Sequence, residues 1–369
     1  MDLRNNVLNF LKKHEKAYYV ANCVRYFKDN ESRKLVLDIN HDPTTIKYEN
    51  FGDLNPDELI YLIYMDNFAL GFFALFMAVM DGLYFAERFH MKPVVEYSDK
   101  CIYNEGHPIN GGENAFEYYF EPVSDISVKD ARQSRNVAMY KQCHRNVNGE
   151  ITVLGNFIAN SGQAAEYMKK RAELYAKYIR LKPEVQEYID RNLDDILGDK
   201  KCIGVHVRGT DFRNEYINHA KVVTLDQYLN AVSLAIKKHG FERIFLATDE
   251  ESTVEKFRER FGSRVVCYND IFRSTDGEPV HFSQASRTDH KYKMGLEVLR
   301  DMYTLAKCDG LICGYSNVSI TARIVRLSTG TPYEYKNIIN NGFNQTGTTT
   351  YRDQKRRAKL QKKKKRQSH

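Results

Sequence analysis

A short apolar strand that ends abruptly in polar residues is the feature that most constrains the fold of this chain. Residues 201–207 have the sequence Lys-Cys-Ile-Gly-Val-His-Val and are followed by Arg208, Gly209, Thr210 and Asp211. A β-branched run of this length is typical of a buried strand. In open α/β sheets, ligands bind beyond the carboxyl ends of the strands, which is where these polar residues stand. An arginine there can form paired hydrogen bonds with a phosphate; a solvated loop with an ion pair is the alternative interpretation.

The second half of the chain repeats this alternation of strand, polar cluster and helix. Besides the first strand, we expect strands at residues 243–250, 264–268 and 309–319. We expect helices at residues 224–239, 252–261, 292–306 and 320–327. Ser252 and Glu255 have the spacing of a capping box, with Ser252 as the N-cap of its helix. Strands that alternate with helices of this length give βαβ units and a parallel sheet.

Polar clusters follow three of the expected strands, at His206 and Arg208, at Asp249, and at Ser316 and Asn317. Right-handed crossover connections place the carboxyl ends of parallel strands at one edge of the sheet. The three clusters are therefore expected to converge there. Such a convergence is difficult to obtain in a fold without a function, so we expect a ligand site at this edge.

Three blocks carry a resemblance to a known family. They are His-Val-Arg-Gly-Thr-Asp at 206–211, Leu-Ala-Thr-Asp at 246–249, and Asp301 followed by Leu305, Asp309, Leu311, Ile312, Cys313, Tyr315 and Ser316. In order and spacing they resemble the α1,6-fucosyltransferases and the related bacterial nodulation fucosyltransferases, which use GDP-fucose without a metal ion. The resemblance implies an α/β fold of the GT-B type, in which two Rossmann-like domains face a cleft.

The resemblance also implies a role for each matching residue. Arg208 matches an arginine that holds the β-phosphate of GDP, and His206 matches a nucleotide contact. Asp301 matches a carboxylate that hydrogen-bonds the guanine edge, and Asp249 matches an acidic residue near the sugar. The loop that surrounds the diphosphate is matched by Ser316, Asn317 and Val318.

The first block departs from the eukaryotic enzymes at two positions. Gly209 stands where those enzymes have a second arginine, and Phe212 stands where they have lysine. Both positions belong to the acceptor and catalytic side of the site. The acceptor and the linkage are therefore left open, while the nucleotide assignment is unaffected.

The chemistry of fucose transfer requires residues of these types, because negative charge grows on the diphosphate leaving group. The chain has no Asp-x-Asp sequence that would hold a metal ion there. An arginine and backbone N–H groups at a helix N-terminus can stabilise the charge instead, so we expect no metal and no cofactor beyond the donor GDP-fucose. A general base must accept the proton of the acceptor hydroxyl. The candidates are Glu215, Asp211 and Asp249, and a surface role for Glu215 is the alternative.

The first half of the chain predicts a second βαβ unit. Its expected elements are a strand at 58–65, a loop at 67–71, a helix at 72–90 and a strand at 93–97. The apolar run at 68–80 is 13 residues long. A membrane span needs about 20, so we expect a buried helix. In a two-domain transferase the loop at 67–71 would face the cleft; a plain tight turn is the alternative.

The length of 369 residues exceeds what one hydrophobic core usually supports, so two domains are expected. We predict an N-terminal, acceptor-side domain at 1–180, a GDP-sugar-binding domain at 181–335, and a C-terminal segment at 336–369 with a disordered basic tail. Helices expected at 164–181 and 183–197 would join the two domains. Seven cysteines without a Cys-x-x-Cys pair are typical of reduced thiols in a cytosolic protein, and no signal peptide is expected at the N-terminus. The eukaryotic enzymes that the chain resembles are membrane-anchored in the secretory pathway, and no anchor is expected here, so the resemblance favours a bacterial cytoplasmic enzyme.

The positive charge of the chain is concentrated at its end. Residues 352–369 carry ten Lys or Arg and one Asp, a net +9, whereas the whole chain carries +7, so residues 1–351 carry about −2. Such a tail binds anionic lipid headgroups at about 1 kcal/mol per basic residue, which would bring the enzyme to the inner membrane face. A solubilising end without a partner is the alternative interpretation.

Three functions remain open from the sequence. The first is an inverting, metal-independent transfer of fucose from GDP-fucose to a hydroxyl of a bacterial surface or secreted glycan. The second is a transferase of the same architecture that uses another sugar nucleotide or makes an α1,2 linkage. The third is a polybasic nucleic-acid-binding or scaffold protein. Asp301 discriminates the first two, because a carboxylate paired with guanine N1 and N2 would reject adenine and uracil.

Overall fold

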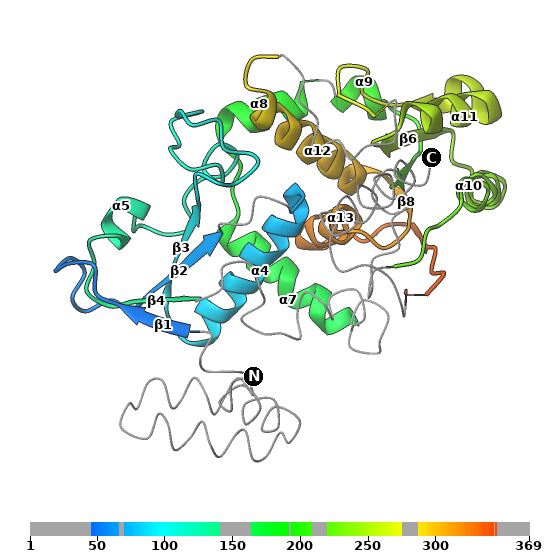
Figure 1. The fold of residues 1–369 in the computed structure, drawn as a ribbon. Coiled ribbons are helices and arrows are strands. Elements are labelled where there is room, and N and C mark those ends of the chain that lie inside the picture. Colours follow the sequence, from blue (N-terminus) through cyan, green and yellow to red (C-terminus); the bar gives the residue numbers. More distant parts are fainter. Residues whose placement is uncertain are drawn as a thin grey trace, which may run out of the picture.

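Two β-sheets, each with its own helices, organise the chain (Figure 1). The structure, a computed structural model, describes residues 46–65, 70–140, 164–191, 193–208, 220–274, 287–342 and 344. Residues 211–219, which include the candidate bases Asp211 and Glu215, and the basic tail at 352–369 lie outside these described residues.

The N-terminal sheet has four strands in the order β1-β4-β2-β3. They are β1 (Ile46–Glu49), β2 (Ile60–Met65), β3 (Lys92–Tyr97) and β4 (Val137–Tyr140). Helix α4 (Phe72–Arg88) connects β2 to the parallel strand β3, which confirms the βαβ unit predicted for this half. β4 is also parallel to β2, whereas β1 is antiparallel to β4 at the edge. A single short helix, α5 (Val128–Ala131), interrupts the long connection from β3 to β4 in this part of the described chain.

The C-terminal sheet has five parallel strands in the order β7-β6-β5-β8-β9. They are β5 (Cys202–Val207), β6 (Arg243–Thr248), β7 (Val265–Val266), β8 (Gly310–Cys313) and β9 (Tyr335–Ile338). The helices between them are α10 (Leu225–His239), α11 (Glu251–Phe261), α12 (His290–Lys307) and α13 (Asn317–Ser328), and the 3₁₀ turn η2 (Gly262–Arg264) precedes β7. Every residue of the central strand β5 is buried. The predicted parallel sheet is therefore confirmed.

The start of α11 differs from the prediction. The helix begins at Glu251, so Glu250 and not Ser252 occupies the N-cap position. The backbone N–H of Glu251 donates to the carbonyl oxygen of Ser274 at 3.4 Å. A backbone carbonyl from a distant segment thus satisfies one of the N–H groups that the first turn of α11 leaves without an intrahelical partner.

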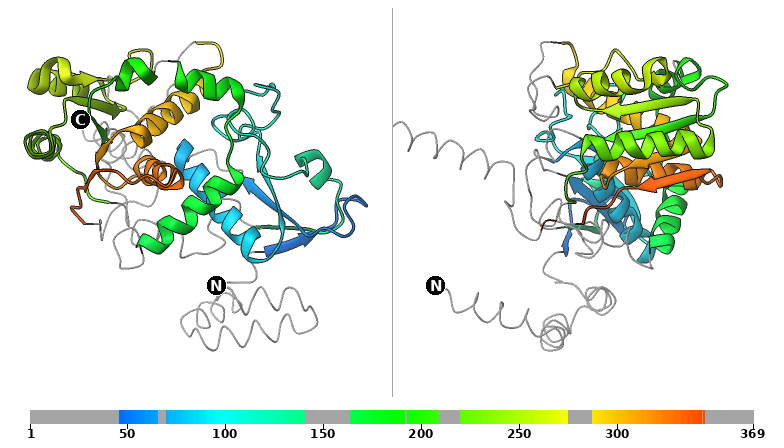
Figure 2. Two further views of the ribbon diagram at one scale, coloured as in Figure 1. Left: turned by 180° about the vertical axis from the view of Figure 1, so that it is seen from behind. Right: turned by 90° about the vertical axis from the view of Figure 1, so that its right-hand side faces the viewer.

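Three helices follow β4 and precede β5 in the chain, and so connect the two units. They are α7 (Ala164–Tyr178), α8 (Pro183–Asp190) and α9 (Leu193–Leu197); we expected the last two as one helix. Figure 2 shows α7 beside both α4 and α13, and one hydrophobic core runs through these helices and α12. Arg171 of α7 forms a buried ion pair of 2.8 Å with Asp81 of α4. None of the helices among the described residues has the length and apolar character needed to cross a lipid bilayer.

The N-terminus of α12 is attached to the N-terminal unit. The backbone N–H of Tyr292 donates to Glu105 at 2.8 Å, and the Tyr119 hydroxyl donates to the carbonyl oxygen of Tyr292 at 2.9 Å. The rings of Tyr119 and Tyr292 stack with their centroids 5.2 Å apart. Gly295 makes this approach possible, since a Cβ atom there would lie 2.2 Å from the Tyr119 hydroxyl oxygen. α12 therefore belongs to the C-terminal unit and is held in place by the N-terminal one.

Candidate active site

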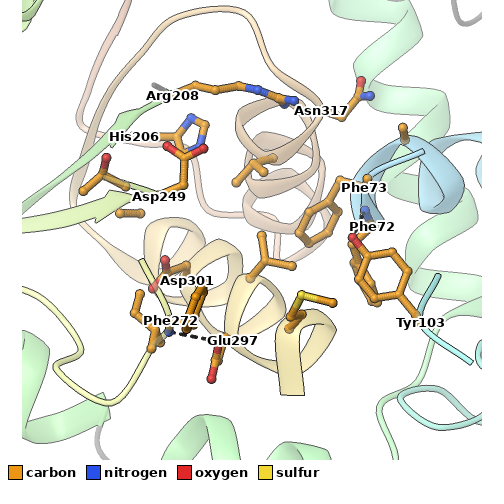
Figure 3. A pocket seen from close by; sticks show the side chains of 18 residues that line it. Phe72, Phe73, Tyr103, His206, Arg208, Asp249, Phe272, Glu297, Asp301 and Asn317 are labelled. Atoms are coloured by element: carbon orange, nitrogen blue, oxygen red, sulfur yellow. Dashed lines mark hydrogen bonds between the residues drawn. The ribbon is translucent and has the colours of Figure 1, made fainter. Parts of the chain in front are cut away.

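A pocket lies between the two units, as the GT-B prediction requires (Figure 3). The N-terminal unit contributes the first turn of α4 and Tyr103. The C-terminal unit contributes the ends of β5 and β6, one face of α12, the first turn of α13, and Ile271 and Phe272 from the connection after β7. The two α/β units that face this pocket confirm the predicted fold class.

Most residues that the sequence singled out lie around this one pocket. Its lining includes His206, Arg208, Asp249, Asp301, Asn317 and Val318. Ser316 lies directly behind His206, to which it is hydrogen-bonded. Gly71, the last residue of the loop expected to face the cleft, also lines the pocket. The sequence did not predict Tyr103, Phe272 or Glu297, which line it as well.

The contact between His206 and Ser316 fixes the side of the pocket where β5 ends and α13 begins. His206 Nδ1 lies 3.2 Å from Ser316 Oγ, and both side chains are buried. Ser316 is the N-cap of α13: its Oγ accepts from the backbone N–H of Ser319 at 3.1 Å, and Ser319 Oγ accepts from the N–H of Ser316 at 3.2 Å. This capping box starts α13 at Asn317, three residues before the predicted start. The first turn of α13, with the positive end of its dipole, therefore borders the pocket.

Arg208 reaches the pocket from the carboxyl end of β5 and comes close to the opposite unit. Burial raises the pKa of Tyr103, and the nearby Arg208 guanidinium opposes this rise. The Tyr103 hydroxyl accepts a hydrogen bond of 2.8 Å from the backbone N–H of Phe72, the first residue of α4. Two helix N-termini and one guanidinium thus border the same region, which favours an anionic ligand group.

Asp301 lines the pocket from α12, and one of its carboxylate oxygens has no hydrogen-bond partner among the described residues. It is 8% exposed, and its Oδ1 has no hydrogen-bond partner among the residues that the structure describes. Burial raises the pKa of this carboxyl from 3.8 to about 7, although the positive charges of Arg273 and Arg300 oppose the rise. A buried acceptor without a partner is costly, so this carboxylate is suited to a ligand with N–H donors.

The pocket as a whole suits an elongated ligand with a charged end and a base. Arg208 and the α13 N-terminus provide the cationic part, Asp301 provides the acceptor, and the aromatic side chains of Phe72, Phe73, Tyr103 and Phe272 also line the pocket. No three His, Cys, Asp or Glu side chains among the described residues come together as a metal-binding group. The two α/β units and the pocket between them have the GT-B architecture.

Comparison with known families agrees with the resemblance drawn from the sequence. The family model of NodZ, nodulation protein Z, matches residues 166–343, a stretch that contains all three sequence blocks. The match agrees with the predicted resemblance to the NodZ-like fucosyltransferases. No curated protein sequence matches the chain.

Solved structures of fucosyltransferases are similar in fold. A crystal structure of NodZ α-1,6-fucosyltransferase soaked with GDP-fucose has 18% identity and a TM-score of 0.44, covering 73% of this chain and 93% of the other. NodZ from Bradyrhizobium has 18% identity and a TM-score of 0.42, covering 72% and 92%. POFUT1 in complex with GDP has 11% identity and a TM-score of 0.40, covering 77% and 99%. Because these TM-scores are below 0.5, the fold class rests on the topology and the pocket described above.

Proposed function

We propose that this chain transfers fucose from GDP-fucose to a hydroxyl group of a glycan, with inversion at the anomeric carbon and without a metal ion. The observation that carries the proposal is the position of Arg208, the α13 N-terminus and the unpartnered Asp301 around one pocket. This pocket lies between the units of a chain that matches the NodZ family model.

The base end of the donor fits Asp301. Guanine presents the N1–H and N2–H groups side by side, and an ionised carboxylate accepts two such donors. Adenine has an acceptor at N1, and uracil offers one ring N–H between two carbonyl oxygens, so neither matches a carboxylate as well. Two N–H donors stabilise the charged form and would lower the pKa of about 7 that burial gives this group.

The diphosphate end of the donor fits Arg208 and the start of α13. When the bond between fucose and the β-phosphate breaks, negative charge develops on the leaving oxygen. A guanidinium and backbone N–H groups that are already in place stabilise this charge with no reorganisation of water. We assign the contacts to Arg208, His206 and the segment Ser316, Asn317 and Val318.

A general base must accept the proton of the acceptor hydroxyl. Asp249 lines the pocket at the end of β6, which supports a position near the sugar. Asp211 and Glu215 remain the other candidate bases. The acceptor, a bacterial surface or secreted glycan, and the cytoplasmic location at the inner membrane face are part of the same proposal.

The proposal is tested by incubating the purified protein with GDP-fucose and a panel of glycan acceptors, in the presence and absence of EDTA. We expect release of GDP and a fucosylated product at similar rates in both conditions. No turnover with GDP-fucose, together with turnover of another sugar nucleotide, would support the alternative donor. Loss of activity in EDTA that Mn²⁺ restores would contradict the metal-independent mechanism.

A further inference from the structure

The segment 268–274, which follows β7, is held beside the pocket by hydrogen bonds to α12 and to the residue after β6. Asp270 receives two hydrogen bonds from the guanidinium of Arg300 on α12, at 2.5 and 3.2 Å. The backbone N–H of Ser274 donates to the carbonyl oxygen of Asp249 at 2.8 Å. These contacts attach the segment to α12 on one side and to the end of β6 on the other, so its middle residues are held at the pocket wall.

Glu297 and Asp301, on the same face of α12, differ in the hydrogen bonds that their carboxylate oxygens form. Glu297 precedes Asp301 by one helical turn, and both line the pocket. Both Glu297 carboxylate oxygens are occupied: Oε1 lies 2.5 Å from Arg287 Nη1, and Oε2 lies 3.1 Å from Arg287 Nη2. Oε2 also accepts the backbone N–H of Phe272 at 3.2 Å, the dashed contact in Figure 3. Asp301 Oδ1 has no such partner among the described residues.

The ring of Phe272 is supported by the same group of side chains. The Arg287 guanidinium lies over this ring, 5.8 Å from its centroid, and the His290 ring meets it edge-on at 5.9 Å. Arg287 Nε donates to His290 Nδ1 at 2.9 Å. Glu297 thus fixes both the backbone of Phe272 and the guanidinium that lies over its ring, while the ring itself lines the pocket.

An aromatic ring and an unpartnered carboxylate in one pocket are complementary to a flat base that carries N–H donors. The ring contributes stacking, which does not depend on the pattern of donors and acceptors, and the carboxylate contributes that pattern. We propose that Phe272 is the stacking surface for the base of the donor and that Glu297 is a positioning residue that holds it there. The inference rests on the proposed function, in which the base is the guanine of GDP-fucose.

The test measures the affinity of the purified full-length protein for GDP and for inosine diphosphate by calorimetry. Inosine diphosphate lacks the N2 amino group, so the ratio of the two affinities reports the hydrogen bonding assigned to Asp301. We expect Phe272→Leu to weaken both nucleotides about tenfold, or about 1.4 kcal/mol, and to leave their ratio unchanged. Phe272→Tyr, which keeps the aromatic face, should retain the affinity.

The positioning role of Glu297 is tested in the same titrations. Glu297→Ala should weaken both nucleotides by about the same factor as Phe272→Leu, and the double variant should lose no more than either single one. Glu297→Gln keeps an oxygen that accepts the Phe272 N–H and should retain most of the affinity. Thermal unfolding identifies any variant that does not fold, and the Phe272 pair tests the stacking surface independently of Glu297.

Each other outcome has a defined meaning. Wild-type affinity in Phe272→Leu would exclude a stacking surface there. Losses that add in the double variant, or a changed ratio in Glu297→Ala, would mean that Glu297 contacts the base itself and is not a positioning residue. A wild-type protein that binds neither nucleotide would refute the proposed function, whereas normal GDP binding with the preceding outcomes would refute only this inference.

Discussion

His206 Nδ1, at the carboxyl end of β5, lies 3.2 Å from Oγ of Ser316, the N-cap of α13. The contact joins two elements that are 110 residues apart in sequence. Ser316 both begins the helix whose first turn borders the pocket and sets the position of the imidazole. The geometry of this side of the pocket thus depends on one hydroxyl group.

Replacement of Ser316 by alanine removes this hydroxyl. The loss of a serine N-cap should lower the free energy of unfolding by about 1 kcal/mol. Turnover of GDP-fucose should fall as well, because His206 and the start of α13 lose their common anchor. Thr224→Ala at the N-cap of α10 is the matched control, since Thr224 forms the same kind of capping box but does not line the pocket. Equal turnover in the two variants would contradict this role of Ser316.

Arg208→Ala should lower kcat by roughly 10²–10³-fold, because the main charge that this side chain stabilises appears in the transition state. The KM for GDP-fucose should change less than kcat. Arg191→Ala, which removes an exposed guanidinium paired with Glu187 at 3.0 Å, is the control and should leave both constants unchanged. Steady-state kinetics that show normal kcat in Arg208→Ala would remove this residue from the catalytic machinery.

The pKa of Asp301 predicts a pH dependence with a defined sign. Burial raises this pKa from 3.8 to about 7, so the folded protein binds the proton more tightly than the unfolded chain. The free energy of unfolding without ligand should therefore decrease as pH rises from about 4 to about 7. Urea unfolding over this range measures the slope, which should be smaller in Asp301→Asn. The same slope in both proteins would show that Asp301 does not titrate in this range.

Binding of the donor should show the opposite trend at this group, because only the carboxylate accepts two N–H donors. With a pKa of about 7, the affinity for GDP should be about tenfold lower at pH 6 than at pH 8. The nucleotide phosphate also titrates, so the same measurement on Asp301→Asn supplies the control. The difference between the pH dependences of GDP affinity in the wild-type protein and in Asp301→Asn is due to Asp301. Identical pH dependences would contradict a contact between Asp301 and the base.

Gly295→Ala should disrupt the contact between α12 and Tyr119 of the N-terminal unit. The new Cβ would lie 2.2 Å from the Tyr119 hydroxyl oxygen and 2.6 Å from its Cζ, and Tyr119 is fully buried. Overpacking of this kind costs about 1–3 kcal/mol. Thermal unfolding should show this loss, and the double variant Gly295→Ala/Tyr119→Leu should recover part of it. No loss in the single variant would mean that α12 and the N-terminal unit are not held together by this contact.

Deletion of residues 352–369 tests the role predicted for the basic tail. Turnover on a soluble acceptor should remain nearly intact, while sedimentation with vesicles that contain anionic lipid should decrease, most clearly at low salt. Loss of activity on the soluble acceptor would show that the tail supports the catalytic body, and the membrane role would then be abandoned.

The sequence predicted the elements that have strong local patterns. The apolar runs of β2, β5 and β6 and the amphipathic helices α4, α10 and α12 were found within a few residues of their observed bounds, whereas β8 was predicted at 309–319 and ends at Cys313. The strands β1, β4 and β9 were missed: each has only four residues, β1 and β9 mix apolar and polar side chains, and β4 pairs with strands far away in sequence. β7 was predicted at 264–268 but spans only Val265–Val266. The following segment 268–274 forms hydrogen bonds to α12 and to Asp249 and does not continue the strand. The domain boundaries at 180 and 335 stay predictions.

The candidate site was predictable where polar residues follow strands or match the family's blocks, as for His206, Arg208 and Asp301. Phe272 and Tyr103 carry no such signal, because hydrogen bonds to Glu297 and Phe72, 25 and 31 residues away, bring them to the pocket. Glu297 had a usable signal: it precedes Asp301 by four residues on the same helical face.

The central claim is that the pocket binds a guanine nucleotide without a metal ion. Calorimetric titration of the protein with GDP, UDP and ADP in the presence of EDTA tests it most directly. We predict saturable binding of GDP and at least about tenfold weaker binding of UDP and ADP, since only guanine offers two adjacent N–H donors to Asp301. Equal binding of all three nucleotides, or no binding of GDP until a divalent metal ion is added, would contradict the claim.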